Sequence, residues 1–186
     1  MDETKVLSKE EKDTLLKLAR NAIDRRFDKS RPKVAVEPTS NLKSSSGAFV
    51  TLHKRGKLRG CIGRFTSDTD LTDTVAEMAQ AAAFEDPRFP SVRPEEMADI
   101  DMEISVLTPM RKIDDVSEIE IGRHGIYIIQ GPMRGVLLPQ VATEQGWDRN
   151  TFLEHTCMKA GLTPNCWQSD KTEIYIFSAE IFSEHD

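Results

Sequence analysis

Cysteine is scarce in this chain of 186 residues, which has only Cys61, Cys157 and Cys166. The number is odd, and no two of the cysteines have the Cys-x-x-Cys spacing that is typical of structural zinc sites. The sequence therefore predicts neither a disulfide framework nor a zinc scaffold, and it indicates a reducing compartment. Cys157 lies on the apolar face of an expected helix, where we expect it to be part of the core.

Long apolar runs are also missing. No stretch approaches the roughly 18 to 20 apolar residues that a membrane helix needs. The first five residues, Met-Asp-Glu-Thr-Lys, do not begin the apolar region of a signal peptide. We therefore expect a cytoplasmic protein that makes no contact with a membrane.

Positive charge is in deficit, since 25 Lys and Arg residues face 31 Asp and Glu residues, for a net charge of −6. This balance disfavours non-specific binding to a polyanion. Aromatic residues make up only 6% of the chain, and none are interleaved with its basic run to offer a stacking surface for a single strand. We expect any contact with nucleic acid to be local.

Two further absences concern cofactors. The sequence has no glycine-rich loop of the Walker or dinucleotide-binding type. It also has no cluster of His and Cys at the spacing of metal ligands. We therefore expect no tightly bound nucleotide, metal or other cofactor.

The residues that are present predict a mixture of helices and strands without an internal repeat. Strands that do not simply alternate with helices are typical of an α+β domain, here with mostly antiparallel sheet and flanking helices. The length fits a single domain, residues 1–186, and can accommodate two lobes that meet at a cleft near residues 58–63.

Capping residues and periodicity place the expected elements. Ser8 and Glu11 form a capping box for a first helix that runs to about Arg26. Alternation over residues 99–107 predicts a half-buried strand. The other expected elements are a short strand at 34–36, a helix ending near residue 84, strands at 126–129 and 135–138, a helix between Asp148 and Gly161, and a last strand at 174–177.

The segment 58–63, Leu-Arg-Gly-Cys-Ile-Gly, concentrates residues that can carry chemistry. Glycine inside a strand usually marks a bulge or a close approach of another backbone or a ligand, which makes Gly60 and Gly63 structural candidates. Cys61 is then either a reactive thiol or, as free cysteines often are, a small apolar residue of the core.

The length of the loop at residues 55–56 decides which side chains share a face with Cys61, because strand side chains alternate. A two-residue turn, the commoner case, places Cys61 opposite Val50 and points His53 to the other face. A three-residue loop places Cys61 opposite Thr51, with His53 on the same side. We favour the tight turn, which excludes a Cys-His pair.

The segment 47–52 followed by 58–63 resembles the signature of the AMMECR domain family, also called AmmeMemoRadiSam system protein A. Further matches follow in the expected order, at residues 86–90, 101–107, 124–125, 135–142 and 159–162. The resemblance spans nearly the whole chain. It implies no settled activity, but family members are similar to proteins encoded beside a Memo-like protein and a radical SAM enzyme. A shared role in modifying a nucleobase or a small metabolite is implied.

Three candidates for catalysis emerge, namely Cys61 as nucleophile or redox thiol and Glu103 or His124 as acid or base. Glu103 is the acid in the middle of the expected strand at 99–107. His124 precedes Gly125 at the start of an apolar strand. The alternatives are a Glu103 that faces solvent or pairs with an arginine, and a His124 that is an ordinary hydrogen-bonded histidine.

Arginines supply the candidates for anion binding, namely Arg59, Arg64 and Arg88. The first two belong to a basic run at residues 54–64, for which we favour a solvated hairpin over a phosphate or carboxylate site. Asp86 and Arg88 lie between prolines, where a local ion pair can hold the loop. We therefore count Asp86 as structural.

Two hypotheses of function remain. The first is an enzyme, or a component of one, that acts with Memo-like and radical SAM partners through a cleft around Cys61. The second is a non-catalytic adaptor, or a substrate-presenting protein, in which residues 58–63 are structural. A thiol that reacts in the native protein favours the first hypothesis, and an inert buried thiol favours the second.

Overall fold

The computed structural model describes residues 7–186, and the chain forms two compact units. Unit 1 consists of the residues up to Leu107 together with Glu180–Asp186, and unit 2 is Thr108–Ala179. Both units combine helices with antiparallel sheet, which confirms the predicted α+β class. No helix within the described residues is long and apolar enough to span a membrane.

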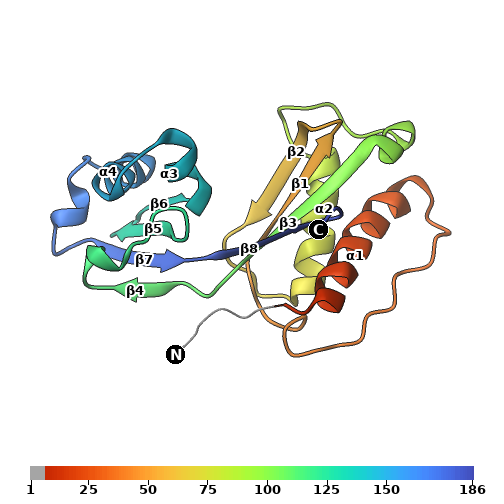
Figure 1. Cartoon of the computed structure of the whole chain (residues 1–186), viewed down its shortest axis with the longest axis horizontal. Helices are drawn as coiled ribbons and strands as arrows, with labels where there is room; N and C mark the ends of the chain where they lie inside the picture. Colours follow the sequence, from red (N-terminus) through yellow and green to blue (C-terminus); the bar gives the residue numbers. More distant parts are fainter. Residues whose placement is uncertain (1–6) are drawn as a thin grey trace. The chain divides into compact units, whose positions relative to one another are not determined.

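Unit 1 is built on a four-stranded sheet, sheet A, in the order β2-β1-β3-β8 (Figure 1). Its strands are β1 (Ala48–Lys54), β2 (Lys57–Arg64), β3 (Ile100–Leu107) and β8 (Ala179–Ser183). β1 is antiparallel to both β2 and β3. The helices are α1 (Lys9–Phe27), α2 (Leu71–Phe84) and a short 3-10 helix, η1 (Pro94–Asp99).

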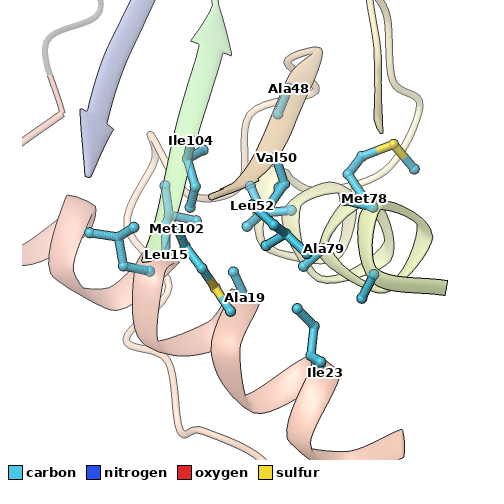
Figure 2. Close-up of a cluster of buried hydrophobic side chains, with 14 of the residues drawn as sticks. Leu15, Ala19, Ile23, Ala48, Val50, Leu52, Met78, Ala79, Met102 and Ile104 are labelled. Atoms are coloured by element: carbon cyan, nitrogen blue, oxygen red, sulfur yellow. The ribbon is translucent and has the colours of Figure 1, made fainter. Parts of the chain in front are cut away.

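Both long helices pack on the same face of sheet A. Val50 and Leu52 of β1 lie with Met102 and Ile104 of β3 in one buried cluster, shared with apolar residues of α1 and α2 (Figure 2). Alternation along a strand sends the residues between them to the opposite face. Thr51 and Glu103 therefore lie on the face away from the helices.

The start of α1 is confirmed as predicted. Ser8 Oγ accepts a hydrogen bond from the Glu11 amide at 3.2 Å, and the Glu11 carboxylate accepts one from the Ser8 amide at 2.8 Å. These two bonds satisfy amide groups that have no partner within the helix.

Unit 2 holds the second sheet, in the order β4-β7-β5-β6. Its strands are β4 (Arg111–Ile113), β5 (Gly125–Gln130), β6 (Met133–Leu137) and β7 (Glu173–Phe177). The helices are α3 (Pro139–Gln145) and α4 (Arg149–Lys159), with 3-10 turns η2 (Val116–Glu118) and η3 (Cys166–Gln168). Gly161 has a φ of 77° just beyond α4, as its predicted role in ending the helix requires.

The expected strand at 34–36 is wrong. These residues are extended but pair with no strand, because residues 28–47 run back beside α1 instead of along a sheet (Figure 1). We call residues 28–47 the return segment. The short elements β4, β8 and α3 were not predicted.

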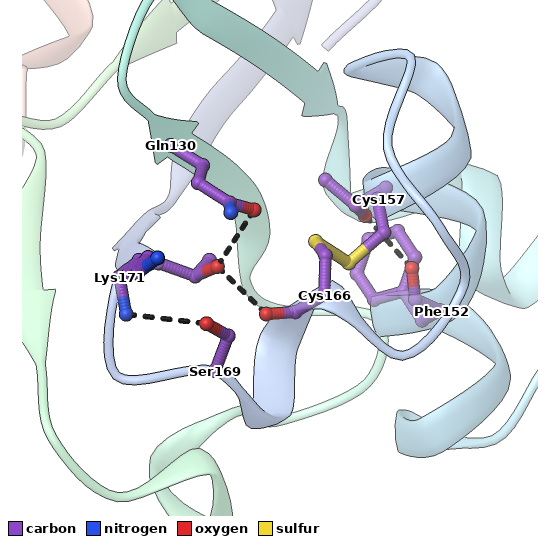
Figure 3. Close-up of a disulfide and its surroundings, with 8 residues drawn as sticks. Gln130, Phe152, Cys157, Cys166, Ser169 and Lys171 are labelled. Carbon is purple, nitrogen blue, oxygen red and sulfur yellow. Dashed lines mark hydrogen bonds between the residues drawn. A yellow bond between two sulfur atoms is a disulfide. The ribbon is translucent and has the colours of Figure 1, made fainter.

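The expectation that the cysteines form no disulfide is also wrong, since Cys157 and Cys166 are bonded to each other (Figure 3). Cys157 lies on the buried face of α4, and it does belong to the core as predicted. The turn at Gly161 folds the chain back so that η3 brings Cys166 against α4. Thr172 Oγ1 donates to the Cys166 carbonyl at 2.7 Å and supports this turn.

Unit 2 depends on this crosslink for part of its stability. The disulfide closes a loop over a sequence separation of nine residues. Its loss is expected to lower the free energy of unfolding by about 2–3 kcal/mol. We predict that reductant destabilises the wild-type protein by this amount in denaturant unfolding, and that the double variant Cys157→Ala/Cys166→Ala does not respond to reductant. Three free thiols in the denatured, unreduced protein would contradict the assignment.

Candidate functional site

The hairpin of β1 and β2 contains one residue more on β2 than on β1. Its turn is tight, with Lys54 opposite Lys57 and His53 opposite Leu58, but Leu52 pairs with Gly60. The extra residue is Arg59, which forms a β-bulge. The sequence revealed the tight turn but not this bulge.

The bulge changes the partner of Cys61. The predicted pairing of Cys61 with Val50 is wrong, because the added residue shifts the register by one and places Cys61 opposite Thr51. His53, two residues along β1, thus lies on the same side as Thr51. Among residues 7–186, however, no hydrogen bond joins the Cys61 thiol to a histidine.

Cys61 is a free, half-buried thiol on the face of sheet A away from the helices. Thr51 Oγ1 donates a hydrogen bond to Cys61 Sγ at 3.2 Å. Glu103 on β3 lies opposite Thr51, so Cys61, Thr51 and Glu103 form one row across three strands. The two outer members of this row were predicted from residue type, whereas Thr51 was expected opposite Cys61 only in the alternative with a three-residue loop.

The peptide of Cys61 is held from the edge of the sheet, because β2 is an outer strand. The Cys61 amide donates to Asp86 Oδ2 at 2.9 Å, and Arg88 Nη2 donates to the Cys61 carbonyl at 3.3 Å. Asp86 and Arg88 therefore bond to the outward groups that a neighbouring strand would otherwise satisfy. We call this pair of side chains the edge clamp.

Asp86 is deeply buried, and it accepts bonds from the Arg88 amide, Nε and Nη2 at 3.1, 2.9 and 2.7 Å. The bonds from the Arg88 side chain, followed by those from the backbone amides, outweigh the effect of burial. They hold the pKa of Asp86 well below its ordinary value, so the carboxylate stays ionised. The side chain of Arg88 remains 55% exposed.

Both glycines of the motif lie against neighbouring groups. A Cβ on Gly60 would lie 2.1 Å from the carbonyl oxygen of Ala82 in α2, so β2 and α2 approach as closely as backbones allow. A Cβ on Gly63 would lie 2.3 Å from the ring of Phe49. Close approach of this kind is the reason a strand retains glycine.

Arg59 points into an ion-pair cluster instead of a binding site. It is buried, and its Nε and Nη2 donate to the two carboxylate oxygens of Glu96 at 3.1 and 3.0 Å. Lys54 Nζ also donates to Glu96, at 2.8 Å. Bonds from Arg59, followed by those from Lys54 and the Arg93 amide, outweigh burial and lower the pKa of Glu96 to about 2.

Two further cations of the basic run are also paired. Arg64 bonds to Glu77 of α2, and Arg55 bonds to Asp99 at 2.7 Å. The prediction of a solvated hairpin holds at its tip, where Arg55 and Lys57 are exposed, but not at Arg59, which is buried. Carboxylates in neighbouring elements pair with most of the charges. Of the three predicted anion-binding arginines, Arg88 combines a contact with Cys61 and a largely exposed side chain.

His124 belongs to unit 2, where it closes a turn before β5. Its Nδ1 accepts a hydrogen bond from the Glu120 amide at 3.1 Å. Burial is the main cause that lowers the pKa of His124, which favours the neutral ring. No group of His, Cys, Asp and Glu that could hold a metal ion occurs within residues 7–186.

The Glu96 cluster makes a prediction about acid stability. Its pKa of about 2 lies below the ordinary 4.5, so the stabilisation is complete above pH 4.5 and is lost as the pH falls toward 2. We expect Glu96→Gln to destabilise the protein by about 3 kcal/mol at neutral pH and to flatten the loss of stability below about pH 5.

Chemical unfolding across this pH range measures both effects. Glu95→Gln is the matched control, because Glu95 is exposed on the same 3-10 helix. Equal acid sensitivity of Glu96→Gln and the wild-type protein would show that the cluster is not the source.

Comparison with known proteins identifies the family. The AMMECR1 family model matches residues 16–182. A protein from Methanothermobacter thermautotrophicus is 46% identical over 185 residues, which cover 96% of each chain, and one from Methanopyrus kandleri is 44% identical over 97% of this chain and 91% of its own. The crystal structure of an uncharacterized protein from Pyrococcus horikoshii superposes with a TM-score of 0.77 at 40% identity, covering 91% of this chain and 89% of that one. The chain therefore belongs to the AMMECR1 family.

Proposed function

We propose that this protein is an enzyme, or a component of one, whose reactive group is the thiol of Cys61. The observation that supports this proposal is the hydrogen bond from Thr51 Oγ1 to Cys61 Sγ at 3.2 Å, on the face of sheet A away from the helices. A hydroxyl that donates to sulfur stabilises negative charge on it, and the thiolate is the form that attacks an electrophile. The thiol serves as nucleophile or redox group.

Two neighbours of Cys61 have assigned roles in this proposal. Glu103 lies opposite Thr51 and acts as the acid or base that exchanges a proton with the substrate. Arg88, which already contacts the Cys61 carbonyl, presents an exposed guanidinium edge to an anionic group of the substrate. His124 stays a prediction from the sequence, and the proposal does not require it.

The proposed substrate is a nucleobase or a small metabolite. The proposed partners are a Memo-like protein and a radical SAM enzyme, and the proposed setting is the cytoplasm. Support for the substrate and the partners comes from the family resemblance, and the proposed setting rests on the lack of long apolar stretches in the sequence. The net charge of −6 argues for a neutral or small substrate over a long polyanion.

A second candidate function is an adaptor that presents a substrate without catalysing its reaction. The observation that favours it is the extent to which the motif serves packing. Gly60 lies against α2, Arg59 is buried against Glu96, and the edge clamp bonds to the peptide of Cys61. On this interpretation Cys61 occupies a small position in the sheet and needs no reactivity.

Alkylation of native Cys61 distinguishes the two candidates. We predict that iodoacetamide labels Cys61 in the folded protein at neutral pH. Thr51→Val should slow labelling roughly five- to tenfold, because one hydrogen bond to sulfur is worth about 1 kcal/mol. Thr51→Ser keeps the hydroxyl and should retain the rate. Peptide mass spectrometry measures the rates, with Cys157 and Cys166 as internal standards that react only after reduction. Labelling that requires unfolding would support the adaptor.

Reconstitution tests the proposed enzyme directly. With the Memo-like protein and the radical SAM enzyme of its own organism, we expect the wild-type protein to be required for turnover of a nucleobase or metabolite. Cys61→Ser should reduce turnover at least about a hundredfold without changing the melting temperature by more than about 2 °C. Arg55→Met, at the exposed tip of the hairpin, is the control variant. Full turnover by Cys61→Ser would contradict catalysis and leave the adaptor.

A further inference from the structure

A groove of about 340 Å³ lies in unit 1 between α1, α2 and the return segment. Its volume falls within the range of small-molecule pockets, roughly 300–1,000 Å³. The groove is formed by the helices, whereas Cys61 lies on the opposite face of sheet A. It is therefore a feature separate from the proposed reactive site.

The return segment is bonded to α1 at the groove and again beyond it. Near the C-terminal end of α1, Asn21 Nδ2 and Arg25 Nε donate to two carbonyl groups of the segment at 3.1 and 3.0 Å. Near the N-terminal end, the Glu11 carboxylate accepts from Thr39 and Asn41 at 2.5 and 3.1 Å. The return segment, which forms one wall of the groove, is thus bonded to α1 at two places. The residues of the segment between these places pair with no strand.

Apolar groups line the middle of the groove. Leu18 and Ala22 of α1 face Ala76 of α2, and Val34 and Val36 of the return segment complete the wall. Alanine on both helices leaves space that larger side chains would fill. Val34 and Val36 are both partly buried where they line the groove.

Charge is distributed unequally along the groove. The two helices run in the same direction, as the bond from Gln80 to the Ala22 carbonyl and the packing of Phe27 on Phe84 at their C-terminal ends show. Arg25 lies toward this C-terminal end, and Lys33 follows Pro32, whose carbonyl accepts from Asn21 one helical turn before Arg25. The acidic Asp73 lies near the start of α2, toward the other end.

The cationic end is open to a ligand. Lys33 is exposed, and Arg25 bonds to the return segment through Nε, which leaves its two terminal nitrogens outside that contact. Leu18 and Arg25 are seven residues apart, about 10 Å along a helix. The apolar wall and the cationic end thus fit one molecule with a short apolar stem.

We propose that this groove binds a small amphipathic anion, with its apolar stem against Leu18, Val34, Val36 and Ala76 and its carboxylate or phosphate at Arg25 and Lys33. Charge complementarity selects this occupant over a neutral or cationic one. Burial of the stem supplies affinity, and the two cations fix its direction.

Titration calorimetry with three probes that share an octyl stem tests this site. We expect octanoate and octyl phosphate to bind the full-length protein and octylammonium to bind at least tenfold more weakly. A comparison of the first two distinguishes a carboxylate ligand from a phosphate ligand. Lys33→Met should weaken both anions about tenfold, and Lys17→Met, an exposed lysine of α1 outside the groove, should not.

A variant that fills the groove locates the binding. Ala76→Phe should abolish binding of both anions, and its melting curve and circular dichroism check that it is folded. Lys33→Met serves as the second test, because the loss of this exposed side chain leaves the wall intact. The proposal is overturned if neither anion binds the wild-type protein, if Ala76→Phe binds them unchanged, or if octylammonium binds as well as octanoate.

Discussion

The extra residue of β2, Arg59, decides which side chains of this strand lie on each face of sheet A. Because Arg59 is an additional residue in the strand, it can turn inward to Glu96 while Cys61 keeps its place opposite Thr51. A regular hairpin with the same turn would direct Cys61 to the helical face, against the core. One β-bulge therefore determines both that a guanidinium is buried and that a thiol lies beside a threonine hydroxyl.

Electrostatic pairing stabilises this arrangement in a protein of net charge −6. The carboxylate of Glu96 accepts bonds from two cations and one amide. That of Asp86 accepts bonds from one cation, Arg88, and from the amides of Cys61 and Arg88. Both acids remain ionised because these donors outweigh burial. The edge clamp also covers the outward groups of β2, which reduces the tendency of an outer strand to pair with another chain.

Local signals in the sequence predicted the local features of the fold. The capping box of α1, the alternation in β3 and the glycine after α4 each depend on neighbouring residues. The features that were missed depend on residues far apart in the chain. The bulge follows from the contacts of Arg59 with Glu96 and of Gly60 with Ala82, and the disulfide requires η3 to fold against α4.

The candidate site was only partly predictable for the same reason. Cys61 and Glu103 stood out by residue type, but the sequence could not reveal that Thr51 lies between them, since one residue of register decides it. Arg59 resembled a ligand-binding residue because its partner Glu96 is 37 positions away. Pairing over such distances is set by the assembled sheet.

Unit 2 is inserted between two neighbouring strands of sheet A. The chain leaves β3 at Leu107 and returns as β8 only after Ala179, and the two crossing points are bonded through Thr108 and Ser178. The last strand also brings Glu180 to Lys12 and Glu184 to Arg20, both on α1. At a rate of synthesis of roughly 5–20 residues per second, β8 is made several seconds after α1 and the other three strands of sheet A. Unit 2, whose residues are continuous in sequence, has its whole sheet available before unit 1 does.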